Sequence, residues 1–158
     1  MKKVITPSKS ITDGQIVRRV KVNRNCTPQE AFNATGCKQY ADRQVVDSMP
    51  HGKGKEVEVV FFKPDLSERN SYISDVDLDK EYKLRGLKPA DPYSVAAVNE
   101  ANPAFADKKP HATHWQNADG KWCIAAFVRW DVVHEVHVFR SYSGWCGDWW
   151  FAGLRLPT

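Results

Sequence analysis

The sequence lacks the features that mark membrane, secreted and zinc-binding proteins. No apolar run approaches the ~20 residues that a membrane-spanning helix needs. The basic first ten residues are not followed by an apolar segment, so they do not resemble a signal peptide. None of the four cysteines belongs to a Cys-x-x-Cys pair, which argues against a zinc ribbon or a thioredoxin-type site. We therefore expect a cytoplasmic protein with free thiols and no membrane association.

Motifs of common catalytic sites are also missing. The chain has no Gly-x-Ser-x-Gly, no phosphate-binding glycine loop and no His-Glu-x-x-His. It has two His-x-x-His pairs, His111/His114 and His134/His137. On an extended strand, positions i and i+3 point to opposite faces, so neither pair is a ready-made chelate. The sequence therefore predicts no catalytic residue, no cofactor and no metal ligand.

Length and charge set the broad class. A chain of 158 residues fits one domain, and we predict a flexible arm over residues 1–14 followed by a single α+β domain over residues 15–158. The net charge of +4 is concentrated at the N-terminal side, where residues 1–55 hold eleven Lys and Arg against four Asp and Glu. Such a surplus can attract nucleic acid or an acidic protein. The predicted patch for an anionic partner comprises Arg18, Arg19, Lys21, Arg24, Lys53 and Lys55.

The first two thirds of the chain combine strand and helix patterns. Residues 15–22 are rich in Val and Ile, residues 56–63 are rich in Val and Phe, and both patterns predict strands. Capping residues predict helices that begin after Thr27, Ser74 and Asp91, and Pro follows the cap in the first and last of these. Shorter helices are expected near residues 41–48 and 103–107.

The helix after Ser74 carries both apolar and acidic residues. Its expected inward residues are Val76, Leu78, Tyr82 and Leu84. Three aspartates lie in its first turns, where the helix dipole favours anions, and this accounts for them without a metal. The aspartates are Asp75, Asp77 and Asp79.

The last third has the pattern of an antiparallel sheet. We predict strands over residues 112–116, 121–130, 134–140 and 149–156, joined by short turns. The strand over 121–130 is apolar on both faces and is expected to be central. The predicted fold is thus a four-stranded antiparallel meander that packs with three or four short helices and with one or two N-terminal strands.

All six tryptophans lie in the final 48 residues. Burial of such large rings is favourable, so most of them are expected in the core. Trp149 and Trp150 are adjacent on a strand and must point opposite ways, which leaves one of them free to line a groove. The loop over residues 141–148 mixes aromatic, hydroxyl and carboxylate side chains. The candidate ligand-binding residues are His114, Trp115, Arg129, His134, His137, Tyr142, Trp145, Asp148 and Trp149.

Three functions fit these patterns. The first is a non-catalytic binding module whose aromatic groove takes a small planar or cyclic ligand, with Trp145 and one of its tryptophan neighbours stacking on it. The second is a small hydrolase with a histidine and a carboxylate, drawn from His114, His134 or His137 with Glu135 or Asp148. The third is an interaction protein that meets a protein partner or associates with itself as a homo-oligomer.

Several segments carry a resemblance. Residues 91–107, 113–115, 120–123 and 149–153, together with residues 27–31, resemble a group of small uncharacterised bacterial proteins that have no assigned activity. The likeness spans most of the chain except its N-terminal arm. It implies a bacterial or phage-related, cytoplasmic origin and implies no function.

Overall fold

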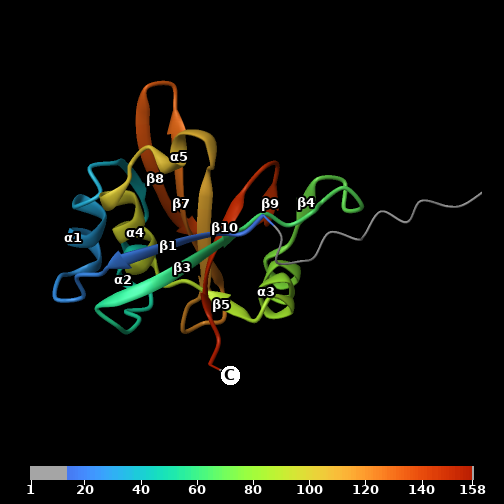
Figure 1. Ribbon diagram of the computed structural model, residues 1–158, viewed down its shortest axis with the longest axis horizontal. Coiled ribbons are helices and arrows are strands. Elements are labelled where there is room, and N and C mark those ends of the chain that lie inside the picture. The colour runs from blue at the N-terminus through green and yellow to red at the C-terminus, as the bar shows by residue number, and fades with distance from the viewer. Residues whose placement is uncertain (1–13, 158) are drawn as a thin grey trace, which may run out of the picture.

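The computed structural model describes residues 14–157, which form a mixed α/β fold around a large sheet (Figure 1). The strands are β1 (Ile16–Lys21), β2 (Lys38–Ala41), β3 (Glu56–Phe62), β4 (Tyr72–Ile73), β5 (Leu87–Pro89), β6 (His111–Gln116), β7 (Trp122–Trp130), β8 (Val133–Arg140), β9 (Trp145–Cys146) and β10 (Trp150–Arg155). The helices are α1 (Pro28–Asn33), α2 (Arg43–Asp47), α3 (Asp75–Leu84), α4 (Pro92–Ala101) and α5 (Phe105–Lys108). The predicted arm lies outside the described residues except for Gly14.

The sheet has eight strands, and seven of them follow the order β1-β3-β10-β6-β7-β8-β2, while β5 pairs with β10. The four predicted C-terminal strands are present, but the four-stranded meander is wrong. Only β6, β7 and β8 are consecutive antiparallel neighbours. Strand β10 instead crosses to the far side of β6, where it pairs parallel to β6 and antiparallel to β3. This crossover joins the N-terminal and C-terminal parts of the chain in one sheet.

The predicted helix starts are confirmed by their caps. Thr27 forms a capping box with Glu30, in which each side chain bonds the backbone of the other residue. Ser74 caps α3 through the backbone N–H of Asp77. Asp91 caps α4 in the same way, followed by proline at the first helical position. Local sequence therefore determines where these helices begin.

The two faces of the sheet are covered differently. Helices α1, α2, α4 and α5 pack on one face, around a core that includes Phe32, Phe61 and Phe127. Helix α3 and the small β4–β9 sheet pack on the other face, with Tyr82 and Phe151 in their core. Figure 1 shows α1, α2 and α4 on one side of the sheet and α3 with β4 and β9 on the other. Because α3 is a single helix, its cover reaches only part of that face.

Helix α3 is rotated relative to the prediction from its apolar residues. Leu78 and Tyr82 are buried as expected, but Val76 and Leu84 are exposed. The buried position near the helix start is instead Asp75. Residues 75, 78 and 82 follow the i, i+3, i+7 stripe of one helix face, so the helix turns a carboxylate toward the sheet. None of the helices over residues 14–157 is both long and apolar enough to cross a membrane.

Candidate ligand-binding site

The face of the sheet that carries α3 is uncovered over strands β7, β8 and β2. Strand register places Tyr40 beside His137, and Ile124 beside Phe139, on neighbouring strands of this face. Phe139 is 39% exposed and Tyr40 is 37% exposed, although both lie within a sheet. Exposed rings on adjacent strands are what a stacking surface requires. We call this surface the open face and define it as Tyr40, Ile124, Val128, Trp130, Val133, His137 and Phe139.

A hollow of about 230 Å³ lies at one end of the open face. Ile124 and Phe139 form part of it, and the loop over residues 141–145 completes it. Tyr142 is 85% exposed at the tip of this loop, and the guanidinium carbon of Arg140 lies 5.5 Å from the centre of its ring. An aromatic ring and a cation therefore flank the hollow.

One buried carboxylate holds the loop beside the hollow. Asp75 Oδ1 accepts hydrogen bonds from His114 Nδ1 at 2.7 Å and from Trp145 Nε1 at 2.9 Å. Asp75 Oδ2 accepts a hydrogen bond from the Ser141 hydroxyl. Ser141 and Trp145 are the two ends of the loop, so one side chain of α3 ties down both. Tyr142 is presented from an anchored loop for this reason.

The electrostatics of this network are set by its three donors. Burial alone would raise the pKa of Asp75, but the hydrogen bonds from His114, Ser141 and Trp145 together lower it. The ring of His114 lies between Trp122 and Tyr82, with ring centres 4.2 Å and 5.6 Å away. Its Nε2 atom is buried and has no hydrogen-bond partner among the described residues.

The same network lacks the contact that a serine hydrolase needs. The Ser141 hydroxyl donates to Asp75 rather than to His114, so the serine–histidine contact of a catalytic triad is not formed. The loop is therefore anchored by Asp75.

Charged side chains border the rings of the open face. His137 Nε2 contacts Glu135 Oε1 at 2.9 Å, and the His137 ring stacks on Tyr40 with centres 5.0 Å apart. Lys38 Nζ lies 5.3 Å from the centre of the Tyr40 ring. A hydrogen bond with the Tyr40 side chain raises the pKa of Lys38, and Glu135 adds a smaller effect of the same sign. Lys38 is thus a fixed positive charge at neutral pH.

The structure disperses most of the predicted ligand-binding residues. His114 and Trp145 meet at Asp75, and Trp149 packs against Trp145 with ring centres 5.5 Å apart. His137 lies on the open face and Tyr142 lies at its end.

The remaining predicted residues lie elsewhere. Trp115 is buried on the helix-covered face. Arg129 and His134 both contact Asp107 of α5, at 3.3 Å and 2.6 Å. Asp148 is exposed and pairs with Lys63 at 3.2 Å. These four residues take no part in the open face.

The six tryptophans divide between the faces of the sheet. Trp145 and Trp149 form an aromatic cluster with Phe151 on the side of α3, and Trp150 packs on the opposite side. The prediction that Trp149 and Trp150 point opposite ways is confirmed. Trp130 is 72% exposed, at the end of β7.

Four of the six basic patch residues line a cleft of about 1060 Å³ between the β1–β3 pair and α4. These residues are Arg19, Lys21, Arg24 and Lys55. Arg19 contacts Glu56 and Glu58 at 3.2 and 3.0 Å, which offsets its charge. Of the two patch residues outside the cleft, Arg18 lies over the Phe105 ring at 5.0 Å and Lys53 is exposed.

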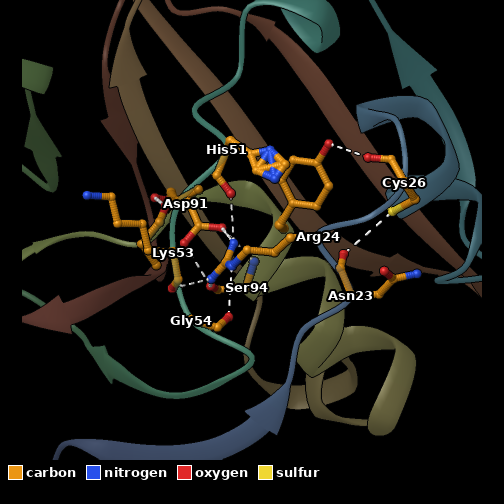
Figure 2. A network of polar contacts seen from close by, with 11 residues as sticks. Asn23, Arg24, Cys26, His51, Lys53, Gly54, Asp91 and Ser94 are labelled. Atoms are coloured by element: carbon orange, nitrogen blue, oxygen red, sulfur yellow. Dashed lines mark hydrogen bonds and ion pairs between the residues drawn. The ribbon is translucent and has the colours of Figure 1, made fainter.

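Arg24 is a structural clamp beside this cleft (Figure 2). Its guanidinium donates to the backbone carbonyls of His51, Lys53 and Gly54 at 2.7–2.8 Å, and it contacts Asp91 at 2.8 Å. Its side chain is only 11% exposed. The positive charge of Arg24 is therefore neutralised by Asp91 and by backbone carbonyls inside the fold. Among the cations that line the cleft, Lys21 and Lys55 form no ion pair in the described part of the chain.

The histidine pairs separate as expected for strands. His111 packs against Phe127 on the helix-covered face, and His114 faces α3. His134 contacts α5, while His137 lies on the open face. Over residues 14–157 no group of three or more potential ligands could hold a metal ion.

Of the seven residues of the open face only His137 was in the candidate set, and the two exposed rings Phe139 and Tyr40 were absent from it. Phe139 follows His137 by two positions, so the alternation of β8 places both side chains on one face. This alternation alone could have predicted Phe139 as a site residue from the sequence. Tyr40 lies on β2, a strand of four residues with the sequence Lys-Gln-Tyr-Ala that has no apolar alternation. Only the tertiary pairing with β8 brings Tyr40 to the site.

Comparison with known proteins adds no family. No family model, no curated protein and no solved structure matches the chain. The resemblance to small bacterial proteins stays a prediction, and the function must be argued from the site itself.

Proposed function

We propose that the protein is a non-catalytic binding module and that its open face stacks on a planar or cyclic ligand. The observation that carries the proposal is the exposure of Tyr40 and Phe139 on neighbouring strands of the uncovered face. Exposed rings in a sheet forgo the burial that stabilises other aromatic residues of the chain. A ligand that covers them recovers this energy, and the anchored loop with Tyr142 extends the same surface.

A rigid support favours binding over the open face. The rings stand on strands with continuous register, and the adjoining loop is tied at both ends to Asp75. Binding to such a preformed surface costs little ordering entropy. The proposed site therefore needs no conformational change before a ligand stacks on it.

Amide chemical-shift mapping with separate ring-bearing probes tests this proposal. A short oligothymidylate and a short oligosaccharide are suitable, because both present rings but differ in charge. We expect at least one probe to shift amides around Tyr40, Phe139 and Tyr142. Phe139→Ala should weaken that binding by about 1 kcal/mol, roughly fivefold, whereas the exposed off-face change Leu84→Ala should not. Shifts confined to the cleft beside α4, or no shifts with any probe, would refute the proposal.

Self-association is the second candidate function. Val132 and Trp130 are 74% and 72% exposed at the turn between β7 and β8, and Val133 follows them. Figure 1 shows this hairpin projecting at the top of the molecule. An exposed apolar tip of this kind fits a contact with a second copy. Sedimentation of the protein and of Trp130→Ser should then show an oligomer that the substitution dissociates, and a concentration-independent monomer would contradict this candidate.

A further inference from the structure

We propose that the ligand of the open face is single-stranded nucleic acid. In this proposal the rings stack on bases while Lys38 and Arg140 contact phosphates. It rests on the proposed function, because it names the ligand class of the same surface. It is supported by the pairing of rings with cations, the spacing of the rings and the absence of carboxylate partners for the two cations among the described residues.

Each end of the surface combines a ring with a cation. At one end Lys38 Nζ lies 5.3 Å from the centre of the Tyr40 ring. At the other end the guanidinium carbon of Arg140 lies 5.5 Å from the centre of the Tyr142 ring. Single-stranded nucleic acid is bound by aromatic rings that stack on bases beside cations that follow the backbone. A neutral sugar would accept hydrogen bonds from the two cations but would gain no charge–charge attraction from them.

The rings are spaced for successive units of an extended polymer. Tyr40 lies beside His137 on the neighbouring strand, and Phe139 follows two residues further along β8. Two residues of a strand advance about 6.6 Å, so the stacked Tyr40–His137 pair and Phe139 form two separate stacking positions. The hollow beyond Phe139 continues this line toward Tyr142. A single strand can therefore cross from β2 over β8 to the loop.

The cations at the two ends of the surface are not neutralised by a carboxylate within the described residues. Within residues 14–157, neither Lys38 nor Arg140 forms an ion pair with a carboxylate. Arg140 Nε is buried and has no hydrogen-bond partner in that part of the chain, so this nitrogen is not itself open to a phosphate. Glu135 is the acid nearest Lys38 on this face, and its carboxylate contacts His137. A strand laid across this surface would thus meet one cation at each end and one acid already engaged by a histidine.

Fluorescence anisotropy with labelled oligothymidylate and oligouridylate tests the proposal on the full chain. We expect binding of both single strands and much weaker binding of a duplex of the same length, whose bases are not free to stack. Phe139→Ala should weaken binding by about 1 kcal/mol, roughly fivefold, the lower end of what one base–aromatic stack contributes. With two phosphate contacts, a plot of the logarithm of the association constant against the logarithm of the salt concentration should have a slope of about −1.4. Lys38→Gln removes one contact, so the slope should become about −0.7. Lys38 is exposed, so its substitution leaves the core intact.

Two controls locate the site. Leu84→Ala removes an exposed apolar side chain of α3, and the double variant Lys21→Gln/Lys55→Gln removes the unpaired cations of the cleft. Neither should change affinity or salt slope. Weaker binding in the double variant with unchanged binding in Lys38→Gln would overturn the proposal, as would the absence of single-strand binding. Oligosaccharide bound at the open face without nucleic acid would overturn this inference and leave the proposed function intact.

Discussion

Removing the Asp75 carboxylate is the sharpest perturbation of the support for the site. Asp75→Ala leaves the donors of His114, Ser141 and Trp145 without their acceptor in a buried position. Each unsatisfied donor costs ~1–3 kcal/mol, and a shared network relaxes in part, so we expect a loss of about 3–6 kcal/mol of unfolding free energy. A typical domain has only ~5–15 kcal/mol in total.

Asp75→Asn provides a milder and more informative variant. It keeps the shape and an acceptor oxygen but removes the charge, so we expect a loss of about 2 kcal/mol. The control is Asp77→Asn on the same helix, whose half-exposed carboxylate contacts Arg69 and Lys80. Surface ion pairs contribute ~0–1 kcal/mol, so this variant should lose less than about 1 kcal/mol.

The assay is urea unfolding followed by tryptophan fluorescence and far-UV circular dichroism across a range of pH. Because the folded pKa of Asp75 is lowered, its stabilising contribution is complete above the unfolded pKa of about 4. It is lost as pH falls through the folded pKa, so the stability gap between the native protein and Asp75→Asn should narrow there. A gap that is constant down to acid denaturation, or a loss below about 1 kcal/mol in Asp75→Ala, would refute the assigned role.

Three further predictions concern other parts of the molecule. Burial lowers the pKa of His111 to about 4, so stability should fall by about 3 kcal/mol as pH drops from 6.5 to 4, and His111→Gln should abolish this slope. Trp130 should dominate iodide quenching because it is 72% exposed, and a quenched fraction unchanged in Trp130→Phe would contradict its position. Gly52→Ala would place a Cβ 2.4 Å from Asp91 Cγ, so it and Arg24→Ala should each destabilise the protein. A double-mutant cycle that shows full additivity of these two losses would exclude a shared clamp.

Local sequence was sufficient for most elements of the fold. Caps and prolines at Thr27, Ser74 and Asp91 mark the helix starts because each satisfies backbone N–H groups of its own first turn. Alternating apolar residues and β-branched residues within each segment predicted β1, β3, β6, β7, β8 and β10, and these patterns are also local. Strand order was not accessible, since the position of β10 between β3 and β6 depends on pairing across distant segments.

The candidate site depended on contacts that no local pattern contains. Asp75 has the residue type and position that the helix dipole favours, so its sequence context gave no indication of a buried role. Its partners lie 39, 66 and 70 residues further along the chain. Phe139 is likewise exposed because α3 covers only part of its face of the sheet. How far a helix covers a sheet depends on the tertiary packing and cannot be seen in a local sequence pattern. Tyr142 was accessible from sequence because it lies in a loop of mixed aromatic and polar residues.

Intermolecular nuclear Overhauser effects test most directly whether the open face is a stacking surface. With bound oligothymidylate, we predict cross-peaks between thymine ring protons and the ring protons of Phe139 and Tyr40. Cross-peaks that reach only Val20, Val22 and Ala97 would place the ligand in the cleft beside α4 and contradict the account.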